Sequence, residues 1–543
     1  MTTSSAAPRT VFLFASLIAF SVLRLLRYLR YFQQEEYAGR RFFAWMVKAR
    51  ALDRRGTLAS VAAAATAACW PAGGAIIVDG FACALFLLAL SEPNPFRSGK
   101  LALRMTARAT RIFAVSTIPV AAAAYGLSRF IVGVPGSSGV ARIAPWLVVA
   151  AMIQLLPGAL VLANAVLAPE ELVRQRRYGR EARDQLDRYK PFVIAVTGSY
   201  GKTSTKLMLA EMLSQAAPTF CPPGSTNTVM GISRCVRESL RPEHRFAVLE
   251  YGAYGRGSIA RLCALAPPSA SIITSIGIMH LERFGTEEAV VLAKSELAAA
   301  TPPGHLLLLN GDDENCRQVG EKYADRKVIL FGTSSASDLD YRLEILSSKA
   351  GVTEFRIHRD GAQHVGRVPI MGRHLLRNML GAFAMSVELG VSPTLLLAVV
   401  RNLRTASNRL EITSDGGVTV LRDAYNSNPI GFQEALSVLG AVGTGRKILL
   451  TPGMVELGPR QFEENATVAQ RAVTLCDHVI FVGSTNRRAL LKGAGSATSR
   501  RAVVETVQTR EEGLARIHAL SKAGDTVLIE NDLPDLYEES QGF

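Results

Sequence analysis

A glycine-rich segment between an apolar run and a helical pattern constrains the fold more than any other part of this chain. The apolar residues Phe192–Val196 are typical of a buried strand, Gly198 and Gly201 follow, and Lys202-Thr203-Ser204-Thr205 opens the helical pattern. Glycines let backbone N–H groups converge on an anion, and the start of a helix adds a partial positive charge. A lysine can neutralise phosphate, and the threonine after it can bind Mg²⁺. The segment therefore predicts an α/β domain that binds phosphate.

The spacing of the two glycines departs from that of the common phosphate loop. Only Ser199 and Tyr200 separate them, whereas the pattern G-x-x-x-x-G-K-[ST] places four residues between its glycines. This shortened loop, together with the lack of a signature helix motif in the sequence, disfavours a transporter ATPase.

Charge and cysteine content narrow the classes of partner. The 543 residues suffice for about three domains, and their net charge of +15 would suit nucleic acid. The arginines, however, crowd into the first third between apolar stretches, and no RNP-like aromatic cluster or zinc-finger spacing occurs. The seven cysteines form no C-x-x-C pair, which indicates reduced thiols rather than a disulfide framework or a zinc site. We therefore expect a lipid bilayer, and no nucleic acid, as a partner.

The first 168 residues are predicted to cross the membrane about five times, since a span needs about 20 mainly apolar residues. Pro71 divides the second candidate stretch from the third, so two short passes compete there with a re-entrant hairpin. Asp79 in the third stretch is either a functional carboxylate within the membrane or a loop residue near the interface. The stretches are Val11–Leu26, Leu58–Trp70, Gly74–Leu90, Ile112–Val134 and Ile143–Leu167.

Basic residues predict the direction of these spans. Arginines and lysines concentrate in the connections 24–55 and 97–111, whereas the connections around Pro71 and Pro135 carry almost none. The positive-inside rule places the basic connections in the cytoplasm. The N-terminus is then outside, and the chain from residue 170 onward emerges in the cytoplasm. A cleaved signal peptide is disfavoured, because the positive flank follows the first apolar run and no A-x-A site is evident.

In the remaining two-thirds of the chain, strand-like apolar runs alternate with helical patterns. Such alternation predicts mostly parallel sheets covered by helices, with ligands at the carboxyl ends of the strands. We expect one α/β domain over 169–402 and a second over 403–543, divided where the composition turns polar. The predicted strands are Phe192–Val196, Phe246–Glu250, Ala270–Thr274, His305–Asn310, Val328–Phe331, Val418–Asp423, Lys447–Thr451, His478–Val482 and Asp525–Glu530.

Three residues that follow the phosphate loop are candidates for its chemistry. Glu250 and His280 each come at the end of a strand-like run, and Lys294 lies on a helical pattern fourteen residues after His280. Taken singly, each has an ordinary explanation: a solvated turn carboxylate, a satisfied polar histidine and a surface lysine. Only their combination with the short loop indicates a shared site.

Together with that loop, they make the chain resemble the Mur ligase family of ATP-dependent amide-forming enzymes, over about residues 191–531. The likeness is greatest to the member that adds D-alanyl-D-alanine to a UDP-muramoyl tripeptide. The implied architecture is a set of N-terminal transmembrane helices, then a P-loop Mur ligase central domain and a Rossmann-like C-terminal domain. Four more segments carry the likeness in the family's order: Met371–Asn378, Asn408–Glu411, Asp423–Pro429 and Met454–Gly458.

The resemblance implies how ATP would be bound. Asn378 would meet the adenine and Asp423 the ribose, while Arg409 would meet the phosphates after domain closure and act as a catalytic residue. The loop residues implied to hold the phosphates are Gly198, Ser199, Tyr200, Gly201, Lys202, Thr203 and Ser204.

The resemblance also implies two metal ions and a modified lysine. Thr203 would bind one Mg²⁺, and Glu250 with His280 would bind a second. Lys294 would carry a carbamate made with CO₂ and would act in catalysis with Lys202. The implied chemistry transfers the γ-phosphoryl group of ATP to a carboxylate acceptor, and an amino-acid or peptide amine then attacks the acyl phosphate. Such phosphoryl transfer needs positioning and charge neutralisation rather than a covalent protein group.

The chain also departs from the family. Leu375 replaces the first asparagine of one motif, Pro452 and Gly453 replace a Gly-Asp pair, and Glu530–Pro534 stands where a Lys-Gly-Ser-Arg-like end is expected. Membrane segments take the place of the family's UDP-binding domain. The ATP half therefore resembles the family more closely than the half that faces the incoming amine.

Three interpretations follow. The first is a multi-pass ligase of the bacterial cytoplasmic membrane, with its catalytic domains in the cytoplasm, acting on an envelope precursor or polymer as poly-γ-glutamate synthetases do. The second is a tethered UDP-muramoyl-tripeptide–D-Ala-D-Ala ligase. The third is a catalytically silent nucleotide-binding scaffold. Such a scaffold would organise other envelope-synthesis proteins, which are therefore further candidate partners.

Overall fold

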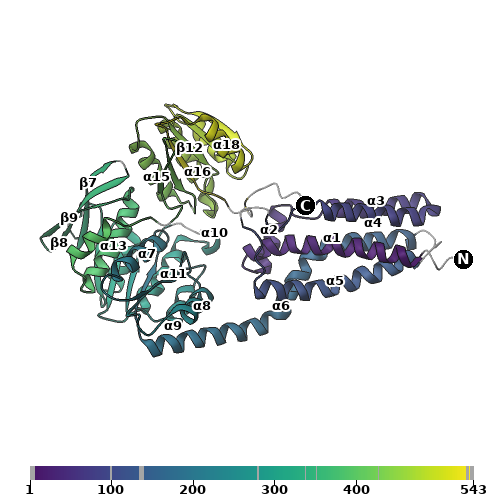
Figure 1. The fold of residues 1–543 in the computed structure, drawn as a ribbon, viewed down its shortest axis with the longest axis horizontal. Helices are drawn as coiled ribbons and strands as arrows, with labels where there is room; N and C mark the ends of the chain where they lie inside the picture. Colours follow the sequence, from purple (N-terminus) through teal and green to yellow (C-terminus); the bar gives the residue numbers. More distant parts are fainter. Residues whose placement is uncertain are drawn as a thin grey trace. The chain divides into compact units, whose positions relative to one another are not determined.

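The computed structural model contains two compact units, one up to Val173 and one from Arg174 to Leu533 (Figure 1). The residues that the structure describes are 6–97, 101–133, 140–277, 281–336, 338–349, 351–405, 407–425, 427–533 and 537.

The first unit is a bundle of apolar helices. Helix α1 packs along both α4 and α5, and α3 packs against α4. Leu17 and Phe20 of α1 are fully buried in this core beside Leu85 of α4. The helices are α1 (Ala6–Gln34), α2 (Gly39–Lys48), α3 (Arg55–Cys69), the 3₁₀ turn η1 (Pro71–Gly73), α4 (Gly74–Leu90), α5 (Ala107–Gly133) and α6 (Val140–Tyr189), which continues into the second unit.

Helices occur at all five predicted stretches, but they differ in length. Among the described residues, α1, α5 and α6 are long and apolar enough to cross a bilayer. Helices α3 and α4 have 15 and 17 residues, which at about 1.5 Å per residue fall short of the roughly 30 Å hydrocarbon layer. Both a pair of short passes and a hairpin return the chain to the side where α3 began. The direction predicted for α5 and α6 is therefore the same in either case.

Buried ion pairs join the end of α1 to the connections around α3 and α4. Arg24 Nε lies 2.7 Å from Asp53 Oδ2, and Arg24 Nη2 lies 2.8 Å from Glu92 Oε1, with Arg24 and Asp53 fully buried. Arg27 also pairs with Glu92, at 3.2 Å. Asp79 lies within helix α4 rather than in a loop, and it pairs with Arg9 of α1 at 3.1 Å.

The second unit begins with a nine-stranded sheet in the order β2-β3-β1-β4-β5-β6-β7-β8-β9. Strands β1–β6 are parallel, as predicted, whereas β7, β8 and β9 form an antiparallel extension. The strands are β1 (Phe192–Thr197), β2 (Thr219–Phe220), β3 (Phe246–Glu250), β4 (Ala270–Ile273), β5 (Leu306–Asn310), β6 (Lys327–Gly332), β7 (Tyr341–Lys349), β8 (Val352–Arg359) and β9 (Ala362–Val368).

Helices cover both faces of this sheet. One face packs α7 and α13 into the core that contains Ile194 and Met379. The other face packs α8, α9 and α11 beside Val193 and Ala293. The helices are α7 (Lys202–Leu213), α8 (Val229–Ser239), α9 (Ser258–Leu265), α10 (Leu281–Phe284), α11 (Glu287–Ala300), α12 (Glu314–Lys322), α13 (Arg373–Glu388) and α14 (Pro393–Val400).

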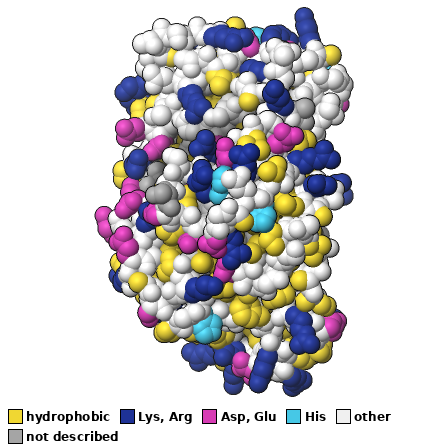
Figure 2. Space-filling view, turned by 90° about the vertical axis from the view of Figure 1, so that its left-hand side faces the viewer, with side chains coloured by type: hydrophobic (Ala, Val, Ile, Leu, Met, Phe, Trp, Pro, Cys, Tyr) yellow, Lys and Arg dark blue, Asp and Glu magenta, His cyan; other side chains and the backbone are white. Residues whose placement is uncertain are grey.

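Side chains of both charges are dispersed over the face of the molecule that the space-filling view shows (Figure 2).

A separate six-stranded sheet follows in the order β10-β11-β15-β12-β13-β14, in which only β10 is antiparallel. The elements are β10 (Glu411–Asp415), β11 (Val418–Asp423), α15 (Pro429–Ala441), β12 (Lys447–Thr451), η2 (Gly458–Arg460), α16 (Gln461–Leu475), β13 (His478–Val482), α17 (Arg487–Gly495), β14 (Val503–Val507), α18 (Arg510–Leu520) and β15 (Thr526–Glu530).

Candidate active site

The glycine-rich loop connects the central strand β1 to helix α7, as predicted. Gly201 has φ +79°, a left-handed conformation that glycine adopts without the Cβ penalty. A Cβ on Gly201 would lie 2.3 Å from Asn378 Oδ1, and a Cβ on Gly198 would lie 2.0 Å from Thr274 Oγ1. Neighbouring side chains therefore leave no room for a Cβ atom at either glycine. The side chain of Asn378, on α13, lies directly against the loop.

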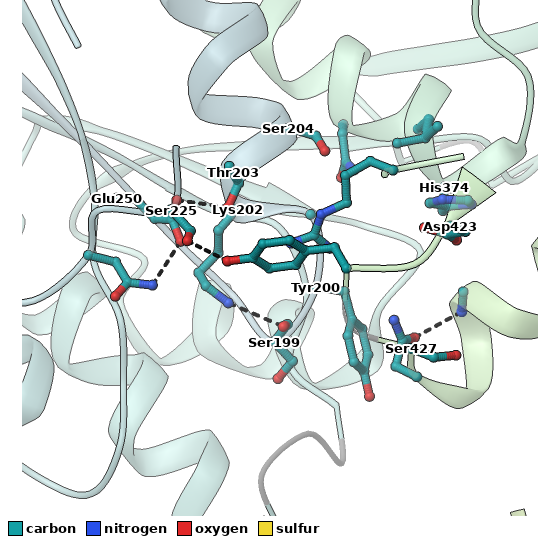
Figure 3. A pocket seen from close by; sticks show the side chains of 18 of the residues that line it. Ser199, Tyr200, Lys202, Thr203, Ser204, Ser225, Glu250, His374, Asp423 and Ser427 are labelled. Carbon is teal, nitrogen blue, oxygen red and sulfur yellow. Dashed lines mark hydrogen bonds between the residues drawn. The ribbon is translucent and has the colours of Figure 1, made fainter. Parts of the chain in front are cut away.

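Lys202 at the start of α7 bonds to its own loop. Its Nζ donates to the carbonyl oxygen of Gly198 at 2.6 Å and to that of Ser199 at 3.2 Å. Figure 3 shows the bond to Ser199. Burial lowers the pKa of Lys202 to about 8, Glu250 opposes that shift, and Arg409 adds to it. A phosphate anion would offer the ammonium group a stronger partner than these neutral carbonyls.

Glu250 lies at the same edge of the sheet, because β3 pairs in parallel with β1 and places Glu250 beside Val196. This carboxylate is almost fully buried. Its Oε2 accepts from Thr203 Oγ1 at 2.9 Å, and its Oε1 accepts from Asn227 Nδ2 at 3.0 Å. The buried Lys206 Nζ lies 3.8 Å from Oε2. Carboxylate and hydroxyl oxygens are the ligands that Mg²⁺ prefers, so Thr203 and Glu250 fit such an ion.

Lys294 is buried on α11, among residues of the core rather than at the surface. Its Nζ makes no hydrogen bond to any residue that the structure describes. Burial lowers the pKa of Lys294 well below its ordinary value, and the charge of Lys202 adds to that shift. The charges of Glu250 and Glu296 oppose this shift, which on balance favours the neutral form of the Lys294 amine.

A cavity of about 210 Å³ opens beside the loop and is lined by both sheet domains of the second unit. It brings together ten of the residues predicted for the site: Ser199, Tyr200, Gly201, Lys202, Thr203, Ser204, Glu250, Asn378, Arg409 and Asp423. Gly198 lies next to this lining as an acceptor for Lys202, Lys294 is not part of the lining, and His280 falls outside the described residues. Among the described residues, no three His, Cys, Asp or Glu side chains form a metal-binding group.

The C-terminal domain forms the wall that faces the loop. The guanidinium of Arg409 lies over the ring of Tyr425, 4.2 Å from its centroid. The hydroxyl of Tyr425 forms a hydrogen bond with that of Ser225, which belongs to the central domain (Figure 3). Arg460 Nη1 of the C-terminal domain also pairs with Glu287 Oε1 of α11, at 2.9 Å. The contacts of Tyr425 with Ser225 and of Arg460 with Glu287 join the two domains around the cavity.

Two acidic side chains end adjacent strands on that wall. Asp423 of β11 pairs in register with Glu530 of β15. Glu530 is fully buried, its Oε1 accepts from Ser427 Oγ at 2.5 Å, and its Oε2 has no hydrogen-bond partner among the described residues. Burial raises the pKa of Asp423 to about 6, while Arg409 opposes that shift. Burial and the charge of Asp423 raise the pKa of Glu530 well above its ordinary value.

Several residues of the cavity were not predicted from the sequence. Asn227, His374, Tyr425 and Glu530 all line it. Burial lowers the pKa of His374 to about 3, so its ring is neutral. Glu530 ends a predicted strand, as Glu250 does. Its position at the carboxyl end of that strand could therefore have identified it from the sequence as a candidate site residue. The others come from loops and helices whose approach depends on tertiary packing.

A short phosphate loop, a buried carboxylate beside it and a second α/β domain facing them define a nucleotide-dependent α/β enzyme. Residues 196–386 match the Mur ligase middle domain, and residues 408–530 match the Mur ligase, glutamate ligase domain. The chain belongs to the Mur ligase family, and it is an ATP-dependent ligase that forms amide bonds.

Individual relatives agree with this assignment. The UDP-N-acetylmuramoyl-tripeptide–D-alanyl-D-alanine ligase of Mycobacterium bovis is 31% identical over 357 residues, which cover 62% of this chain and 69% of that protein. The crystal structure of MurF from Acinetobacter baumannii has a TM-score of 0.59 at 26% identity, covering 66% of this chain and 77% of that chain. MurF ligase from Thermotoga maritima, solved in complex with ADP, has a similar fold, with a TM-score of 0.58 at 24% identity and coverage of 66% and 80%.

Proposed function

We propose that this chain is a membrane-anchored Mur ligase that activates a carboxylate of a membrane-borne envelope precursor and joins it to an amine. The observation that carries the proposal is the cavity in which Lys202, Thr203 and Glu250 face Arg409 across the two domains. The apolar helices α1, α5 and α6 support the membrane anchor. The distribution of arginines supports an outside N-terminus and a cytoplasmic catalytic unit.

In this proposal ATP lies along the cavity, with its phosphates at the loop. The N–H groups of residues 198–204 and the ammonium of Lys202 bind the β- and γ-phosphates, and Arg409 approaches the γ-phosphate from the other domain. Asn378, which lies against the loop, contacts the adenine, and Asp423 contacts the ribose. The Mg²⁺ ions would neutralise phosphate charge, held by Thr203 and by Glu250 with His280.

The proposed reaction has two steps. A substrate carboxylate oxygen attacks the γ-phosphorus, the bond to the β-phosphate oxygen breaks, and an acyl phosphate forms with ADP. The amine nitrogen then attacks the acyl carbon and a C–N bond forms. Phosphate leaves with the C–O bond electrons, and the proton lost by the nitrogen passes to the released phosphate. Closure of the two domains, which the contact between Tyr425 and Ser225 already joins, would reduce the access of water to the acyl phosphate.

One experiment tests both the reaction and the orientation. Sealed inside-out membrane vesicles containing the full chain are expected to release phosphate from added MgATP only when a carboxylate acceptor and an amine are both present. Right-side-out vesicles are expected to show no release until they are permeabilised. Phosphate release at the full rate when the acceptor or the amine is left out would contradict ligation. Phosphate release by intact right-side-out vesicles would contradict the proposed orientation.

Lys294 is proposed to carry a carbamate, because burial lowers its pKa and favours the neutral amine, which is the form that adds CO₂. The nitrogen bonds to the carbon of CO₂ and releases a proton, so the side chain becomes an anion. In CO₂-free buffer we expect turnover to fall and to return when bicarbonate is added. Protein labelled with ¹³C-bicarbonate should show a carbamate carbon signal by NMR.

The matched controls for this prediction are two lysine variants. Lys294→Ala should lose the carbamate signal, while Lys322→Ala, which changes an exposed lysine of α12, should keep it. Turnover that is insensitive to CO₂, with no carbamate signal in the unchanged protein, would exclude the modification.

A second candidate is supported by the relatives. The ligases that match this chain are named for adding D-alanyl-D-alanine to UDP-N-acetylmuramoyl-tripeptide, and a tethered enzyme could perform that same reaction. Glu530 weighs against it, because the family resemblance places a lysine at this position on the wall that faces the amine. Supplying D-Ala-D-Ala with UDP-muramoyl tripeptide in the vesicle assay separates the two candidates.

A further inference from the structure

The cytoplasmic end proposed for the first unit carries arginines that its own acidic residues do not neutralise. Arg40, Arg50, Arg54 and Arg55 are exposed and make no ion pair or hydrogen bond through their side chains in the described part of the chain. Arg97 and Arg104, in the connection before α5, are exposed in the same way. Their positive charges are therefore available to a ligand.

The acidic residues near these arginines are already paired within the bundle. Asp53 and Glu92 bind the buried Arg24, and Glu35 and Glu36 both bind Arg41, at 3.5 and 2.8 Å. The excess of positive charge is thus a property of the folded surface rather than of composition alone. An anionic partner from outside the bundle would complement it.

Apolar side chains stand among the same arginines. Phe43 and Val47 of α2 are 43% and 79% exposed, and Leu52 is 54% exposed. In the connection before α5, Leu101 and Met105 are 52% and 39% exposed. A soluble anion would leave these side chains in water, whereas a lipid offers both phosphate and acyl chain to the surface.

Helix α2 is fixed to the bundle by its opposite face. Trp45 stacks on Tyr31 with ring centroids 4.5 Å apart, and Phe42 packs on Phe32 at 5.0 Å. Phe42, Trp45 and Met46 are buried. The connection before α5 is held to the same place, because Arg30 Nε and Gln33 Nε2 donate to the carbonyl oxygens of Leu101 and Arg104. The two basic segments therefore form one surface, which we call the α2 platform (residues 40–55, Arg97 and residues 101–105).

We infer that the α2 platform is an interfacial binding site for the phosphate headgroups of anionic phospholipids. Helix α2 lies in the plane of the membrane surface with Phe43 and Val47 toward the acyl chains and the arginines toward phosphate. The inference rests on the membrane anchor proposed above. It adds that the cytoplasmic end of the helix bundle binds one class of lipid, the anionic phospholipids. A basic residue near an anionic membrane surface contributes about 1 kcal/mol, or about fivefold in affinity.

Tryptophan fluorescence can test the platform directly. The chain has three tryptophans, so replacing Trp70 and Trp146 by phenylalanine leaves Trp45 as the only reporter. In vesicles, we expect brominated phosphatidylglycerol to quench Trp45 at least fivefold more effectively than brominated phosphatidylcholine. Changing Arg40, Arg50, Arg54 and Arg55 to glutamine should reduce this preference to about one. Changing Arg129 and Arg142, which lie outside the platform, should leave it intact.

Each contrary outcome would overturn the inference. Equal quenching by the two lipids, or a preference that survives the four arginine changes, would exclude a headgroup site. Protection of Trp45 by soluble pyrophosphate at constant ionic strength would assign the surface to a soluble anion. A variant that keeps only Trp70 reports whether the helix bundle inserts into the bilayer. If neither brominated lipid quenches Trp70, the proposed membrane anchor itself is contradicted. Lys202→Ala should keep the lipid preference, so a failure of the proposed ligation would be distinguishable.

Discussion

Lys202→Ala is expected to lower the rate of ATP-dependent phosphate release by at least about a thousandfold, the range that single cationic groups contribute to phosphoryl transfer. The alanine removes the only ammonium group that the described loop would offer to the phosphates in the proposed function. In the unchanged protein, Lys202 Nζ donates hydrogen bonds to the carbonyl oxygens of Gly198 and Ser199. Because these bonds lie within the loop, the protein should still fold without them. Phosphate release by purified protein measures the rate, and circular dichroism with thermal unfolding measures the fold.

The pH dependence gives this prediction a second readout. Since burial lowers the pKa of Lys202 to about 8, the side chain is protonated below that pH and neutral above it. Nucleotide affinity in the unchanged protein should therefore fall as the pH rises through about 8, and Lys202→Ala should lose this dependence. Lys322→Ala, on the surface of α12, is the matched control. A variant at position 202 with near-normal turnover would contradict the assignment.

Glu250→Gln is expected to reduce turnover by about two to three orders of magnitude and also to destabilise the protein. The change removes the charge proposed to bind Mg²⁺ and replaces one acceptor oxygen with a donor. Thr203 and Asn227 both donate to Glu250, so one of them would lose its partner. The buried Lys206 would also lose its counter-charge at 3.8 Å. Breaking a buried ion pair costs about 3–5 kcal/mol.

Glu243→Gln is the control for that prediction, because Glu243 is exposed just before β3. We expect it to leave both the thermal midpoint and the rate unchanged. A Mg²⁺ titration of each variant separates the two effects, since a lost metal ligand raises the Mg²⁺ concentration needed for half-maximal turnover. Equal Mg²⁺ dependence of Glu250→Gln and the unchanged protein would exclude the proposed metal role.

The regular parts of the fold follow from local patterns. Apolar runs predicted β3, β12 and β13 to the residue, since strands buried on both faces of a parallel sheet have no polar side. The bounds of the half-buried β11 were also predicted to the residue. The antiparallel strands β7–β9 escaped prediction because many of their residues are exposed and their apolar positions are interrupted. The half-exposed β14 was missed for the same reason.

The site divides in a similar way. The meeting of Lys202, Thr203 and Glu250 follows from sequence, because adjacent parallel strands bring their carboxyl ends to one edge of the sheet. The positions of Arg409 and Asp423 came from family resemblance, since no local pattern links residues about 200 positions from the loop. The contact of Ser225 with Tyr425 depends on how two sheets approach each other. That geometry is set by long-range packing and leaves no local signal.

The contact between Gly201 and Asn378 has a consequence for how this enzyme can vary. The amide of Asn378 occupies the volume that a side chain on Gly201 would need. A side chain at position 201 would therefore displace this amide from the loop. If Asn378 contacts the adenine as proposed, a substitution in the phosphate loop would also weaken recognition of the base.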